Sequence, residues 1–129
     1  MRLLDLFSGT HSVGRAFQDQ GWDVTSLAND SRTRPTICCD IMSWQYTDFA
    51  PDYFDHIHAS PPCTEYSRAK TKGVRDLFSA DCIAEKALEV IKYFSSATYS
   101  IENPCGGKYT LEKRGILDDL PRYVITLQI

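Results

Sequence analysis

Short apolar runs and longer amphipathic stripes alternate along this chain, with polar turns between them. Six apolar runs bounded by turn-forming residues predict strands, at residues 2–7, 23–28, 36–40, 53–59, 98–101 and 123–128. Each run is shorter than a typical helix, and the first five are followed by glycine, proline, aspartate or serine within a few positions. The pattern therefore favours a sheet built from short, mostly buried strands.

Three stretches between these runs have the period of a helix instead. The first covers residues 11–20, with Val13 and Phe17 on one face. The second covers residues 76–96 and carries a long apolar stripe, and the third covers residues 111–119. Strands that alternate with helices predict a parallel sheet with helices on both faces, which is a doubly wound α/β fold. Such folds bind ligands at the carboxyl ends of their strands.

Composition limits the classes of protein and the locations that fit this chain. The 129 residues are enough for one domain, residues 1–129, and no apolar run is long enough to cross a membrane. The formal charge of −3 and the pI of about 5.5 do not by themselves indicate a nucleic-acid binder. Five cysteines without a C-x-x-C pair support neither a disulfide framework nor a metal site. We expect a reducing location, in the cytoplasm or associated with the nucleoid.

The first predicted turn lies in "DLFSGTHSVG", between a strand and a helix. Gly9 lets the backbone approach a ligand, and the helix that follows offers unpaired N–H groups. Asp30 follows the second predicted strand, where an acid can bind a ribose diol. Asp40 ends the third predicted strand, and with Ile41 it can offer a polar edge and an apolar face to a purine. These residues suggest an adenosine-containing ligand. The alternative is that the turn is structural and the aspartates only cap turns.

Asp5 lies within the first predicted strand, among apolar neighbours. A buried carboxylate is costly there unless it is hydrogen-bonded.

The stretch "DHIHASPPCTEYSRAK" begins as a strand and ends in a rigid elbow. Pro61 and Pro62 stop the strand because proline has no N–H for the ladder, and they present Cys63. A thiolate can add to an electron-poor ring carbon if its surroundings activate it. The alternative is a buried, inert cysteine, which is the interpretation we give to the other four cysteines: Cys38, Cys39, Cys82 and Cys105.

Glu102 directly follows the predicted strand at residues 98–101. We expect this strand to lie beside the one that leads to Cys63. A carboxylic acid there can protonate or hydrogen-bond a ring nitrogen as the thiolate attacks. The stretch "SRAKTKGVR" follows the cysteine and is suited to gripping the phosphates of a nucleic acid, although such a run is often only a solvated surface. Its candidate contacts are Ser67, Arg68, Lys70, Lys72 and Arg75.

Together these residues resemble the cytosine-C5 DNA methyltransferases, which use S-adenosylmethionine. "DLFSGTH" is similar to the opening D-L-F-x-G-x-G of that family, "SPPCTEYS" to its P-C elbow, "ENP" to its E-N-V, and "RDLF" to its R-x-x-L-F. The resemblance covers almost the whole chain. It implies a Rossmann-like methyltransferase fold with a mostly parallel sheet.

The resemblance also implies roles for individual residues. Cys63 would attack C6 of a cytosine flipped out of DNA, with Glu102 bound to N3 and the exocyclic amine. Methyl transfer to C5 and β-elimination would follow. S-adenosylmethionine would be bound by residues of the strand ends and turns: Phe7, Ser8, Gly9, Thr10, Asp30, Asp40, Ile41, Pro61 and Leu77.

The chain departs from the family pattern in four places. His11 replaces the second glycine of the turn, Ala28 stands near the usual ribose acid and leaves Asp30 as a displaced substitute, and Pro104 replaces the valine of E-N-V. The sequence ends at Ile129, so we expect a fold incomplete at its C-terminus, without a target-recognition domain. The alternatives are a non-catalytic cofactor-binding module, half of a split enzyme with a partner chain or as a homodimer, and an RNA cytosine methylase.

Overall fold

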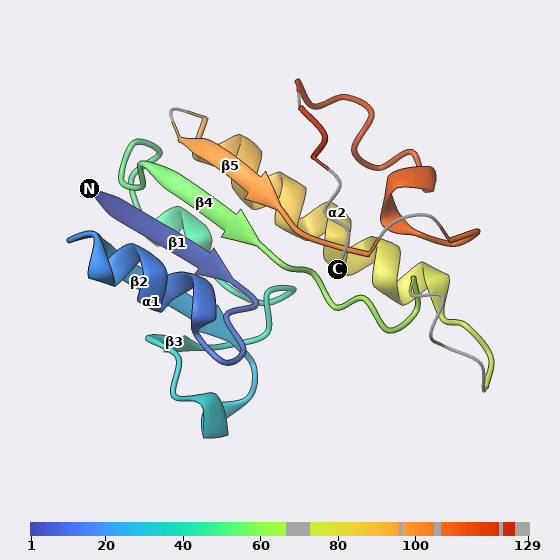
Figure 1. Ribbon diagram of the computed structural model, residues 1–129, viewed down its shortest axis with the longest axis horizontal. Helices are drawn as coiled ribbons and strands as arrows, with labels where there is room; N and C mark the ends of the chain where they lie inside the picture. Colours follow the sequence, from blue (N-terminus) through green and yellow to red (C-terminus); the bar gives the residue numbers. More distant parts are fainter. Residues whose placement is uncertain (67–72, 96, 105–106, 122, 126–129) are drawn as a thin grey trace.

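The computed structural model describes residues 1–66, 73–95, 97–104, 107–121 and 123–125 (Figure 1). Within that part of the chain, parallel strands form one five-stranded sheet in the order β3-β2-β1-β4-β5. The strands are β1 (Arg2–Leu6), β2 (Asp23–Ala28), β3 (Ile37–Cys38), β4 (His56–Ala59) and β5 (Thr98–Ile101). The two α-helices are α1 (Ser12–Asp19) and α2 (Leu77–Tyr93). The doubly wound α/β fold is therefore confirmed.

The strand order places a topological switch point between β1 and β4. From β1 the chain winds outward to β2 and β3, then returns to the other side of β1 for β4 and β5. Because parallel crossovers are right-handed, the two directions of winding put α1 and α2 on opposite faces of the sheet, as Figure 1 shows. The loops after β1 and β4 diverge at this point, and ligands of open α/β sheets bind in such a crevice.

The sheet face under α2 holds the apolar core. Leu4 and Leu6 of β1 and Ile57 of β4 have no exposed surface and belong to one cluster with Val90 and Ile91 of α2. Residues two apart on a strand share a face, so the alternation in "RLLDL" and "HIHA" decides which side chains enter this core. Burial of such side chains stabilises a fold by roughly 1.5–3 kcal/mol each.

The opposite face is polar along one row. Ser26, Asp5, His58 and Ser100 lie side by side in register on β2, β1, β4 and β5. Helix α1 covers part of this face through Gly14, where a Cβ atom would come within 3.4 Å of Asp5 Oδ2 and within 3.3 Å of a methyl group of the adjacent β2 strand. A larger residue there would push α1 away from the sheet.

A ladder of hydrogen bonds runs along the same polar face. His56 Nδ1 bonds with Thr98 Oγ1 at 2.7 Å and its Nε2 bonds with Ser100 Oγ at 2.9 Å. His58 Nδ1 bonds with Ser100 Oγ at 2.8 Å and its Nε2 with Ser60 Oγ at 3.0 Å. The two half-buried imidazoles are thus satisfied at both nitrogens, which is what burial of polar groups requires. We call this chain of five residues the histidine ladder.

The sequence predicted most elements closely. Two strands have the predicted bounds, Asp23–Ala28 and Thr98–Ile101. The predicted strands at residues 2–7, 36–40 and 53–59 are shorter than expected but present. Helices α1 and α2 lie within the predicted ranges and lose only their ends.

One predicted helix was wrong, and one predicted strand is absent over the part of it that the structure describes. Residues 111–119 do not form an α-helix: a 3₁₀ turn at Leu111–Lys113 is followed by irregular turns, because Gly115 adopts a φ of 77° that a right-handed helix cannot include. Residues 123–125 form no strand, and their side chains are 72–100% exposed. They are not paired with a strand of the described sheet, and strand structure needs such a partner. Residues 126–128 lie outside the described residues.

No helix in the described residues is both long and apolar enough to span a bilayer.

Candidate active site

The turn after β1 has an unusual backbone. Phe7, Gly9 and His11 all adopt positive φ angles, of 62°, 47° and 65°. The turn is held by hydrogen bonds from Ser8 N to Leu27 O at 3.1 Å and from His11 N to Ser8 O at 2.8 Å. Left-handed conformations at non-glycine residues are costly and gather at functional sites, where the surrounding structure holds them. The turn is therefore a candidate for ligand binding.

Buried polar atoms without a partner lie at the same edge of the sheet. Within the described part of the chain they are Asp5 Oδ2, Ser8 Oγ and Asn103 Oδ1. Asp5 lies near the end of β1, and Ser8 and Asn103 lie two residues beyond β1 and β5. Most buried polar atoms are hydrogen-bonded, so these three are candidates for contacts with a ligand. Burial raises the pKa of Asp5 to about 6, against opposing effects from His11 and from the backbone N–H of Gly14.

His11 fits the turn by pointing its side chain toward the loop after β2. Its Nε2–H donates to the carbonyl oxygen of Thr33, a residue of the 3₁₀ turn η1 (Ser31–Thr33). The imidazole therefore joins the first turn to the loop that follows β2. This contact explains how the chain accommodates a side chain at that position.

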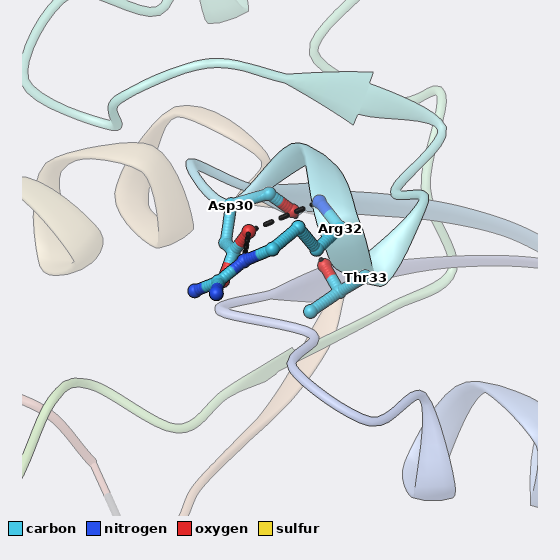
Figure 2. A network of polar contacts seen from close by, with 3 residues as sticks. All are labelled: Asp30, Arg32 and Thr33. Carbon is cyan, nitrogen blue, oxygen red and sulfur yellow. Dashed lines mark hydrogen bonds and ion pairs between the residues drawn. The ribbon is translucent and has the colours of Figure 1, made fainter.

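Asp30 lies two residues beyond β2 and caps η1 (Figure 2). Its Oδ1 accepts from the backbone N–H of Arg32 at 3.0 Å, and its carboxylate also forms an ion pair with the Arg32 guanidinium at 2.8 Å. These hydrogen bonds from Arg32 lower the pKa of Asp30. Because the Arg32 side chain is 88% exposed, the ion pair is weak and open to exchange with a ligand. A diol contact by Asp30 stays a prediction.

The other predicted cofactor residues are spread around the same edge. Asp40 caps a turn by accepting from Met42 N at 2.9 Å, and Ile41 is only 4% exposed because it belongs to the core. Thr10 is exposed, and Leu77 is half-buried at the first position of α2. Their contacts with a cofactor stay predictions.

Strands β4 and β5 are neighbours, as the sequence predicted. Ala59 pairs with Ile101, and Glu102 N donates to Ala59 O at 2.9 Å, so Glu102 leaves the sheet directly beside the start of the elbow. Cys63 carries a free, half-buried thiol three residues after Ser60. The topology thus brings the strand ends that carry the two predicted catalytic residues to adjacent positions.

A second contact joins the elbow to the end of β5. The side-chain amide of Asn103 donates to the carbonyl oxygen of Pro61 at 2.9 Å, and Pro61 itself is buried. The residue after Glu102 is therefore fixed to the first proline of the elbow, two residues beyond β4.

The sequence interpretation missed the histidine ladder. Burial lowers the pKa of both His56 and His58, and the negative charge of Glu102 partly opposes this effect at His58. Glu102 thus lies within electrostatic reach of the ladder. Two histidines at alternate positions of a strand, in "HIHA", were the available signal, because such residues share one face.

Of the predicted nucleic-acid contacts, only Arg75 is described. Its Nη1 donates to Glu65 O at 2.6 Å, and its guanidinium lies 4.8 Å from the centre of the Tyr109 ring. Ser67, Arg68, Lys70 and Lys72 lie outside the described residues, as does Cys105.

Two shallow surface hollows lie elsewhere. One of about 260 Å³ is formed mainly by residues 42–47, and one of about 440 Å³ lies between α2 and residues 115–119. Neither is lined by the first turn or by the elbow. The described residues contain no cluster of three or more histidine, cysteine, aspartate or glutamate side chains suited to a metal ion.

The parallel sheet and its switch point define a Rossmann-like α/β domain. Comparison with known proteins finds a similar viral protein. The sequence is 34% identical over 140 aligned positions to a "Probable DNA (cytosine-5)-methyltransferase" of Frog virus 3 (isolate Goorha), an alignment that includes 97% of this chain. The chain spans 62% of the length of that relative. No model of a known protein family matches the sequence. The chain is thus similar over almost its whole length to a protein named as a probable DNA (cytosine-5)-methyltransferase.

Proposed function

We propose that this chain transfers a methyl group from S-adenosylmethionine to C5 of cytosine in DNA, through a covalent adduct on Cys63. The observation that carries the proposal is the pairing of β4 with β5, which puts the Cys63 elbow next to Glu102. The similarity to a viral protein named as a cytosine-5 methyltransferase supports the same reaction.

The residues at the strand ends suit S-adenosylmethionine. The turn from Phe7 to Thr10 would hold the methionine part, and the unpartnered oxygens of Asp5 and Ser8 offer acceptors for an ammonium group. Asp30 would bind the ribose in place of its ion pair with Arg32. Adenine would lie near Asp40, Ile41, Pro61 and Leu77. When bound, the cofactor supplies a methyl group on a positively charged sulfur, which a carbon nucleophile can take.

The chain's own side chains supply the rest of the chemistry. The Cys63 thiolate forms a bond to C6 of a flipped cytosine, while Glu102 hydrogen-bonds or protonates N3 so that the ring electrons move to C5. C5 then accepts the methyl group. Loss of the C5 proton to a base re-forms the C5–C6 double bond and breaks the C6–S bond, which returns the thiolate. Arg75 and the basic stretch at residues 67–72 would grip the DNA backbone.

The proposal is tested by transfer of an isotope-labelled methyl group to unmethylated DNA. We expect Cys63→Ser to abolish transfer while S-adenosylhomocysteine still binds as in the wild type, measured by calorimetric titration. Cys82→Ser is the matched control, because Cys82 is also a free, half-buried thiol but lies on α2. Undiminished transfer by Cys63→Ser would overturn the nucleophile assignment.

Two other outcomes would select an alternative. Binding of S-adenosylhomocysteine without transfer by the wild type would favour a cofactor-binding module or half of a split enzyme, acting with a partner chain or as a homodimer. Transfer to RNA in preference to DNA of the same sequence would favour an RNA cytosine methylase.

A further inference from the structure

Tyr66 anchors the far side of the elbow. It is only 1% exposed and belongs to a small core cluster with Ala80 and Ala84 of α2 and with Leu111. Its backbone N–H donates to the carbonyl oxygen of Cys63 at 3.0 Å, which closes a turn over the four residues from Cys63 to Tyr66. The side chain that follows the thiol by three positions is therefore buried in a separate core.

The Tyr66 hydroxyl ends in a charged pair. It donates to Asp81 Oδ1 at 2.8 Å, and Asp81 Oδ2 accepts from Arg114 Nη2 at 2.7 Å. Burial, together with Asp81, raises the pKa of Tyr66, and the Arg114 hydrogen bond lowers the pKa of Asp81. The hydroxyl therefore stays a donor and the carboxylate stays an ionised acceptor at neutral pH, a pairing stronger than a neutral hydrogen bond.

Glu65 makes further contacts with the segment that starts α2. Its carbonyl oxygen accepts from Arg75 Nη1 at 2.6 Å, and its carboxylate accepts from the backbone N–H of Asp76 at 2.9 Å. Asp76 in turn caps α2 by accepting from Ser79 N at 3.1 Å. The segment at the start of α2 is thus hydrogen-bonded to Glu65, two residues after Cys63.

We propose that Tyr66, Asp81 and Arg114, the elbow anchor, are positioning residues that hold the Cys63 thiol at the edge of the sheet. The inference rests on the proposed function, in which Cys63 is the nucleophile. On one side of Cys63 the elbow is fixed by the Asn103 contact with Pro61, and on the other by Tyr66. A thiol held between two fixed points loses little freedom when it attacks a base, which is how positioning lowers a barrier.

The rate at which the Cys63 thiol is alkylated tests the positioning role in the absence of DNA. Alkylation of Cys63 by iodoacetamide is followed by mass spectrometry of its peptide in the folded chain, with the exposed Cys38 as internal reference. We expect Tyr66→Phe, which removes only the hydroxyl, to speed the alkylation of Cys63 about fivefold relative to Cys38. Arg114→Gln should act in the same direction. In the double variant the effect should be less than the product of the single effects, because both act through Asp81.

Tyr93→Phe is the matched control. This variant also loses one hydrogen bond, which the Tyr93 hydroxyl donates to Phe49 O at 2.6 Å. Tyr93 is the last residue of α2, whereas Asp81 lies near the start of that helix. Unchanged alkylation in Tyr66→Phe, or an equal increase in Tyr93→Phe, would overturn the inference.

In methyl transfer, Tyr66→Phe should lower kcat about fivefold and leave KM for S-adenosylmethionine unchanged. A change in KM alone would contradict a positioning role. Failure of the proposed function shows separately, as retained transfer in Cys63→Ser, whereas failure of the anchor shows in the alkylation rates.

Discussion

The side-chain amide of Asn103 donates a hydrogen bond of 2.9 Å to the carbonyl oxygen of Pro61. This bond joins the end of β5 to the end of β4, next to both proposed catalytic residues. Asn103 Oδ1 is buried without a partner in the described residues, so the same side chain also offers an acceptor to a ligand.

Asn103→Ala should therefore both slow methyl transfer and destabilise the fold. The Pro61 carbonyl loses its side-chain donor, at a cost of about 1–3 kcal/mol in the free energy of unfolding. Misplacement of the elbow should reduce the rate of methyl transfer by about 10–100-fold. Initial rates and urea unfolding measure the two effects. Gln45→Ala, which removes an exposed amide far from the elbow, serves as control, and equal losses in both variants would contradict the assigned contact.

Asp5→Asn should stabilise the protein at neutral pH. Asp5 is 2% exposed and its pKa is raised to about 6, so the ionised carboxylate lowers the stability of the folded state above that pH. The penalty is absent below the unfolded pKa of about 4, grows as the pH rises to about 6, and is constant above, at roughly 1–3 kcal/mol. Thermal unfolding at pH 4 and pH 8 should thus show a gain only at pH 8. The variant should also bind S-adenosylhomocysteine more weakly, and a gain of equal size at both pH values would refute this account.

The histidine ladder should make stability fall in weak acid. Burial lowers the pKa of His56 and His58, so the folded state favours the neutral rings. Their contribution is complete above the unfolded pKa of about 6.5 and is lost as the pH falls from there through the folded values. A double variant, His56→Gln with His58→Gln, cannot take up these protons. Between pH 7 and pH 5 it should lose less unfolding free energy than the wild type, and parallel losses would exclude the ladder as the cause.

Asp30 and Arg32 should have opposite effects on cofactor binding. If Asp30 binds the ribose, Asp30→Ala should weaken the binding of S-adenosylhomocysteine by about tenfold, as expected for a lost hydrogen bond to a charged group. Arg32→Ala releases the carboxylate from its ion pair and should bind at least as tightly as the wild type. Because the Arg32 side chain is exposed and such surface ion pairs contribute little, neither change should measurably alter the stability. Calorimetric titration decides, and unchanged affinity in Asp30→Ala would leave the aspartate with only its capping role.

Much of the fold could be predicted from periodicity. The strand at Asp23–Ala28 and the helix at Leu77–Tyr93 were visible because apolar positions repeat with the period of each structure over several residues. The predicted helix at residues 111–119 failed because Gly115 and the packing of Ile116 and Leu117 against the core overrode a weak pattern. Residues 123–125 have the composition of a strand, but a strand also depends on a neighbour that the sequence does not identify.

The sequence by itself determined which groups are available for binding and catalysis: a thiol after two prolines, a glutamate at a strand end, and a turn with a glycine that can adopt a positive φ angle. These follow from residue types and from their spacing along one stretch of chain. Only the tertiary structure decided which of them meet. The strand order put Glu102 beside the Cys63 elbow, turned Asn103 toward Pro61 and placed Tyr66 against Asp81 and Arg114. Such contacts join residues far apart in the chain, and their geometry is fixed by the packing of whole strands and helices rather than by local preference.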